Sequence, residues 1–110
     1  MAKTDAIIKY ILFDQIKANK AYSLKADKIY KNRDYTESQK GERLASLAIR
    51  SVRETANNCT MIFKLIEAMG GNDELAASIY GIFKNPYQLT EQHEAFKLLE
   101  DLEAEAAANE

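Results

Sequence analysis

The stretch IYKNRDYTE, residues 29–37, marks a joint between two helices, and a related stretch follows later in the chain. There IFKN occupies residues 82–85 and TE occupies residues 90–91. In both stretches an apolar helical pattern gives way to turn-forming residues, and a threonine followed by an acidic residue offers an N-cap for a new helix. The two joints therefore predict helices connected by short loops.

The residues on either side of the first joint predict a long helical hairpin over residues 4–69. The first helix should begin near Thr4 and continue to Lys31, and the second should begin at Thr36, which has capping-box spacing to Gln39. Gly70-Gly71 then supplies the left-handed backbone that commonly ends a helix. A short loop between two helices of about 30 residues each favours antiparallel neighbours.

Each helix of this hairpin carries one apolar stripe at three- and four-residue spacing, and we expect the two stripes to be buried against each other. Cys59 falls on the second stripe, so it is interpreted as a small buried hydrophobe. The first stripe is Ile8, Ile11, Leu12, Ile16, Tyr22, Ala26, Ile29 and Tyr30. The second is Leu44, Leu47, Ala48, Val52, Ala56, Cys59, Ile62, Phe63, Ile66 and Met69.

Two shorter helices should follow the hairpin. Asn72 or Asp73 can cap a helix over residues 72–85, and Pro86 ends it because the residue before a proline is forced out of helical geometry. Thr90 is expected to cap a last helix over 90–104, followed by a frayed acidic tail over 105–110. The chain is thus predicted to be one all-α domain over residues 1–110, a long antiparallel hairpin with two shorter C-terminal helices.

The sequence offers little material for catalysis or for a cofactor. The single cysteine has no partner for a disulfide, and the single histidine, His93, has no second ligand three or four residues away on its helix. We therefore predict no enzyme activity, no cofactor and no metal, with His93 an exposed helical residue. Uncharged stretches reach only about nine residues, against roughly 20 for a membrane span, which favours a cytoplasmic protein without membrane contact.

Charge is strongly segregated along the chain. Residues 1–64 carry 13 Lys/Arg against 7 Asp/Glu, a net charge of +6, whereas residues 65–110 carry 2 against 10, a net charge of −8. The basic residues of the hairpin are the best candidates for a partner-binding surface. Those predicted to bind a partner are Lys9, Lys17, Lys20, Lys25, Lys28, Lys31, Arg33, Arg43, Arg50 and Arg53.

Three kinds of partner fit such a chain. A larger protein, engaged through the charged surfaces of the chain, is the leading expectation, and a polynucleotide bound along the lysine-rich face of the first helix is the alternative. The acidic C-terminal third can also mimic nucleic acid and occupy the basic groove of another protein. Because two short helices cover only part of a hairpin some 40 to 50 Å long, self-association is expected as well. A compact four-helix monomer is the competing interpretation.

Residues 29–44 resemble a stretch found in small helical phage-encoded proteins, both head-associated structural proteins and accessory proteins. The shared form is a long helix, a short joint ending in Thr or Ser with an acidic residue, and a Lys-Gly pair that opens the next helix, here Lys40-Gly41. The resemblance implies a non-enzymatic protein that acts by contact, in the host cytoplasm or the virion. It would be a component of virion assembly or an inhibitor of a host defence factor.

Overall fold

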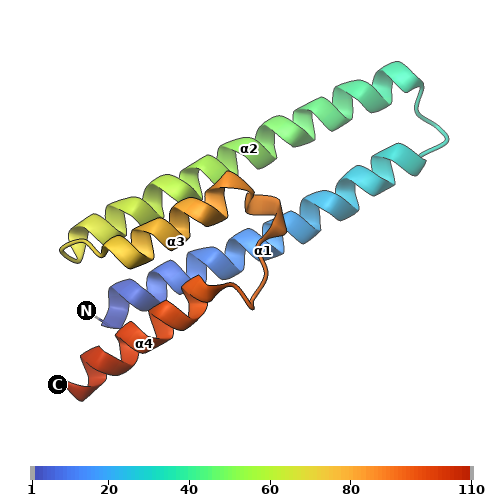
Figure 1. The fold of residues 1–110 in the computed structure, drawn as a ribbon. Helices are drawn as coiled ribbons and strands as arrows, with labels where there is room; N and C mark the ends of the chain where they lie inside the picture. The colour runs from blue at the N-terminus through green and yellow to red at the C-terminus, as the bar shows by residue number, and fades with distance from the viewer. Residues whose placement is uncertain (1, 110) are drawn as a thin grey trace.

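The computed structural model describes residues 2–109, in which helices joined by short loops make up the fold (Figure 1). The predicted all-α architecture is confirmed: a long antiparallel hairpin is followed by two shorter helices, and residues 2–109 contain no strand. The elements are α1 (Ala2–Lys31), α2 (Glu37–Ala68), α3 (Asp73–Lys84), the 3₁₀ helix η1 (Pro86–Gln88) and α4 (Glu94–Ala108).

The first joint has the predicted capping box. The Gln39 backbone N–H donates to the Thr36 hydroxyl at 3.1 Å, and the Thr36 N–H donates to the Gln39 side-chain oxygen at 2.9 Å. Asn72 caps α3 in a similar way by accepting from the Leu75 N–H at 2.9 Å. These side chains satisfy amides that have no partner inside their own helices, so they define where α2 and α3 begin.

The second joint differs from the first, and the prediction that Thr90 caps the last helix was wrong. The Pro86–Gln88 turn is followed by extended Leu89, whose side chain is buried in the core. Anchoring Leu89 there delays the helix until Glu94. His93 is its N-cap, and its Nδ1 accepts from the Ala95 N–H at 3.1 Å.

Two helix ends also lie elsewhere than predicted. The helix α1 already includes Ala2, so Thr4 lies inside it and does not cap it. The helix α4 continues through residues predicted to fray and ends at Ala108, with Asn109 as its C-cap. Alanine and glutamate are both good helix formers, which accounts for the longer α4.

The core lies at one end of the molecule, between the first half of α1, the second half of α2, α3 and α4 (Figure 1). Here the predicted stripes are buried, as at Ile8, Leu12 and Ile62. Toward the loop the prediction fails, because Tyr30 is 69% exposed and Val52 is 60% exposed. The short helices α3 and α4 do not reach these positions, so the apolar stripes lose their cover.

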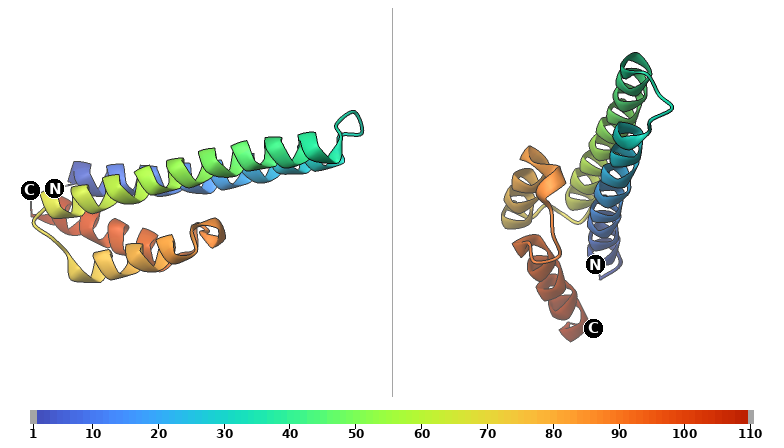
Figure 2. Two further views of the ribbon diagram at one scale, coloured as in Figure 1. Left: turned by 90° about the horizontal axis from the view of Figure 1, so that it is seen from above. Right: turned by 90° about the vertical axis from the view of Figure 1, so that its right-hand side faces the viewer.

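The uncovered end is called the arm below, defined as residues 20–50. The adjoining residues Asn19 and Ser51 are the ones that hydrogen-bond to η1. Figure 2 shows the arm extending well beyond α3 and α4. The molecule measures 60 × 21 × 19 Å with a radius of gyration of 17.2 Å, whereas a compact chain of this length has about 13 Å. The arm is therefore a projection built from only two helices.

Two glycines provide a test of this backbone. Gly71 has φ +84°, which a residue with a Cβ rarely adopts, whereas Gly41 lies within α2. An added Cβ meets no atom within 4 Å at either position. Because an added methyl group has room at both positions, the backbone conformation alone should decide how each substitution changes the stability.

We expect Gly71→Ala to lower the free energy of unfolding by about 1 to 2 kcal/mol and Gly41→Ala to raise it by up to about 1 kcal/mol. Urea unfolding followed by circular dichroism measures both changes. If both substitutions changed the free energy of unfolding in the same direction, the left-handed backbone at Gly71 or the helical backbone at Gly41 would be contradicted.

Candidate docking surfaces on the helical arm

A buried amide joins the two hairpin helices at the root of the arm. Gln15 is 1% exposed, and its Nε2 donates to Thr55 Oγ1 at 3.1 Å and to Asn19 Oδ1 at 2.9 Å. Its Oε1 accepts from Asn58 Nδ2 at 2.9 Å. Asn19 in turn donates to the Pro86 carbonyl at 2.9 Å. This cluster of four side chains sets the register of α1 against α2 and attaches η1 to both.

Sequence reasoning missed this cluster, although a signal was present. Gln15 lies four residues after Ile11 and three after Leu12, in the middle of the apolar stripe. A polar residue at such a position needs a buried partner, and polar residues there commonly specify the register of a helix pair. Asn58 and Thr55 occupy equivalent positions on the second helix.

Two further contacts hold the root of the arm. The Tyr22 hydroxyl donates a short hydrogen bond to a Glu54 carboxylate oxygen, and the hydroxyls of Ser51 and Tyr87 lie 3.1 Å apart. The bond to Glu54 raises the pKa of Tyr22, with burial and the charge of Glu54 adding to the effect. Both contacts cross between elements, so the arm is joined firmly to the rest of the molecule.

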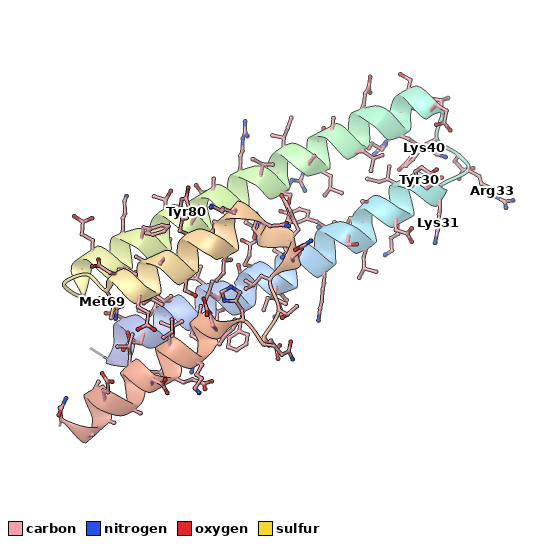
Figure 3. The ribbon with its side chains drawn as sticks, in the orientation of Figure 1. Tyr30, Lys31, Arg33, Lys40, Met69 and Tyr80 are labelled. Atoms are coloured by element: carbon pink, nitrogen blue, oxygen red, sulfur yellow. The ribbon has the colours of Figure 1, made fainter. Side chains whose placement is uncertain are left out.

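The ten basic residues predicted to bind a partner are distributed over several surfaces. Lys9 is half-buried, with its Nζ 3.3 Å from Glu103 on α4, and Lys31 pairs with Asp27 at 3.0 Å. Lys17 and Lys20 lie beside Glu91 at a separate hollow. At the tip, Figure 3 shows Lys31 and Arg33 pointing into solvent. Arg53 is exposed on α2.

The other four basic residues come together on one side of the arm. Lys25 and Lys28 from α1 and Arg43 and Arg50 from α2 line a groove of about 650 Å³, called the basic groove below. Among residues with described side chains, none of the four forms an ion pair. The other lining residues are Ile29, Tyr35, Gln39, Glu42, Ser46 and Leu47.

The guanidinium of Arg43 lies over the ring of Tyr35, 4.3 Å from its centroid. At this distance the ring attracts the cation and orients its donors. Ile29 and Leu47 contribute apolar surface to the same groove, and Glu42 contributes one negative charge. The arrangement can bind an anionic group such as a carboxylate while also burying apolar atoms. Tyr35 and Ser46 were not among the predicted binding residues.

A second groove lies on the opposite side of the hairpin, where the arm meets η1. It has a volume of about 400 Å³ and is mainly apolar; it is called the step groove below. Val52 and Tyr87 are 60% and 52% exposed there. Its lining residues are Asn19, Tyr22, Ser23, Ala26, Leu44, Leu47, Ala48, Ser51, Val52 and Tyr87. The helices α3 and α4 cover one half of this face of the hairpin, and the step groove lies where their cover ends.

The two candidate reactive residues, His93 and Cys59, are both half-buried, one at the start of a helix and the other within one. His93 is half-buried as the N-cap of α4, so the expectation of an exposed helical residue was wrong. Cys59 is half-buried, not fully buried, and burial raises the pKa of its thiol, which disfavours the reactive thiolate. The side chains described for this chain include no group of three or more His, Cys, Asp or Glu placed to hold a metal.

Comparisons with known proteins found no relative of this chain. No family model matches the chain, and neither a curated protein nor a solved structure is similar to it. Within the helices described here, none combines the length and the apolar character needed to cross a bilayer.

We predict that Gln15→Leu lowers the free energy of unfolding by about 2 to 3 kcal/mol, because Asn58 and Asn19 each lose a buried partner. The double variant Gln15→Leu/Asn58→Leu should lose less free energy of unfolding than the two single variants lose together, since it removes both members of a pair. Gln88→Leu, at an exposed position of η1, is the matched control and should change stability by no more than about 0.5 kcal/mol. Additive effects of Gln15 and Asn58 would contradict a coupled cluster.

A buried carboxylate provides a pH-dependent test. Asp5 is 1% exposed and its Oδ1 has no hydrogen-bond partner. Burial raises the pKa of Asp5 above its ordinary value of 3.8, and the nearby charge of Glu103 raises it further. Between pH 3.8 and this raised pKa the folded state holds more protons than the unfolded state, so the contribution of Asp5 to stability falls as pH rises.

We therefore expect Asp5→Asn to raise the melting temperature at pH 7, and the difference from the parent chain to shrink as pH falls toward 3.8. Thermal unfolding at a series of pH values measures this. Asp14→Asn removes an exposed carboxylate from the same helix and controls for the change in net charge. A difference that grows on acidification would show that Asp5 is charged and stabilising in the folded state.

Proposed function

We propose that the chain is a non-enzymatic protein-binding accessory or structural protein of the phage type, which docks the basic groove of its arm onto an acidic surface of a larger protein. The partner would be a virion component or a host defence factor. The observation that carries the proposal is the convergence of Lys25, Lys28, Arg43 and Arg50 in one groove, where none of them forms an ion pair with a side chain that the structure describes.

The rigidity of the arm supports this role. The capping box at Thr36, the stacking of Arg43 on Tyr35 and the Tyr22 bond to Glu54 hold the loop and both helices in place. A preorganised surface loses less conformational entropy on binding than a flexible one. The projecting shape also lets the groove reach into a recess of a larger partner, because the arm is only two helices thick.

The composition of the groove favours a protein over a polynucleotide. Ile29 and Leu47 offer apolar contact, whereas Glu42 would repel a phosphate. One face of the Tyr35 ring is occupied by Arg43, which leaves less of it for stacking a base. Nucleic-acid binding stays the alternative, since four cations in one groove also attract phosphates.

The test compares capture of proteins from host lysate by two double variants. Arg43→Gln/Arg50→Gln removes two charges from the basic groove, and Arg33→Gln/Arg53→Gln removes two exposed charges outside it. We expect the groove variant to lose at least about tenfold in affinity for the captured protein, with the control close to the parent chain. Circular dichroism checks that both variants remain folded.

Titration with a labelled single-stranded and a labelled duplex DNA at low salt tests the alternative. Weak or absent binding is expected. Tight binding to DNA that falls steeply with salt, together with no captured protein, would replace the proposal with nucleic-acid recognition.

A further inference from the structure

The face of the hairpin that α3 and α4 cover continues along the arm without cover. The step groove opens there, and Ala45, Ala48, Val52 and Ala56 follow one another at three- and four-residue spacing as an exposed apolar strip on α2. The chain exposes 7667 Å², about 1,500 Å² more than a compact monomer of its mass exposes. A standard interface buries about 800 Å² per partner, so the excess is sufficient for one.

The lengths of the elements match this bare face. The arm leaves residues 20–31 of α1 uncovered, about 18 Å of helix, and the 12 residues of α3 also measure about 18 Å. In the left view of Figure 2, α3 and α4 form a layer under one half of the hairpin, with a step at η1 where that layer ends. A layer of the same kind and length, turned around, would fill the other half.

Charge separates the arm from the remainder of the chain. Residues 20–50 carry eight Lys/Arg and four Asp/Glu, a net charge of +4, and the remaining residues carry seven and thirteen, a net charge of −6. Pairing arm with arm would set +4 against +4. Pairing two molecules in opposite directions keeps the two basic arms apart. The step groove, whose lining residues are all uncharged, then meets the α3 and α4 layer of the other molecule.

From these observations we propose that the step groove is the interface of an antiparallel two-fold dimer. Each copy places its α3 and α4 layer on the bare face of the arm of the other copy. The two layers then meet end to end near Tyr87, close to the two-fold axis. The contact is self-complementary, so it closes at two copies and forms no chain. Since the basic groove lies on the other side of the hairpin, the dimer presents two such grooves, and its formation does not depend on their partner.

Sedimentation equilibrium at about 50 µM tests the dimer, with an expected mass of twice 12.4 kDa. Val52→Glu places a charge in the step groove and should weaken the dimer at least about tenfold. Met61→Glu introduces the same charge on the same helix at a similar exposure of 52%, outside the groove, and should remain a dimer.

The orientation of the copies has its own measurement. In a Cys59→Ser background, a spin label at Asp34→Cys marks the tip of each arm. Electron–electron distance measurements should give a tip-to-tip separation approaching the 60 Å length of the molecule. A monomeric parent chain, larger polymers, or tips closer than about half that length would each overturn the proposal.

Discussion

The buried amide of Gln15 is the interaction on which the rest of the structure depends. An amide inside an apolar interior is costly unless its oxygen and nitrogen are both paired. Asn19 is one turn away on the same helix, but only one alignment of the hairpin brings Asn58 and Thr55 to the amide. A slide of one turn along the hairpin would leave several polar groups buried without partners. The apolar stripes alone tolerate such a slide, because isoleucine, leucine and alanine pack against one another in many registers.

The same cluster determines where the covered and bare halves of the molecule lie. Asn19 binds the Pro86 carbonyl and thereby holds η1 at the middle of the hairpin. The helices α3 and α4 extend from there toward the chain ends, so their apolar residues build the core on one side only. The arm then keeps surfaces that a four-helix bundle would bury. One constraint thus accounts for both the compact half and the projecting half.

The two grooves of the arm follow from this division. The step groove is the continuation of a core face, so it is apolar, whereas the basic groove lies on the side that no helix covers and is lined by the lysines and arginines of both helices. Residues 18 positions apart in sequence, such as Lys25 and Arg43, become neighbours only because the hairpin is closed in this register. The basic groove therefore depends on the buried cluster at the root of the arm, although none of its lining residues belongs to that cluster.

The amino-acid sequence by itself determined the helices, the hairpin and the first joint, because capping at Thr36, the glycine pair after α2 and helical periodicity are local effects. The tertiary structure decided where α4 starts and why Tyr30 and Val52 are exposed. It also decided which four of the ten basic residues predicted to bind a partner come together in one groove. Thr90 had the local signature of a cap, but burial of Leu89 outweighed it. Which face of a helix is covered depends on the length and position of the neighbouring helices. The apolar periodicity of one helix predicts neither.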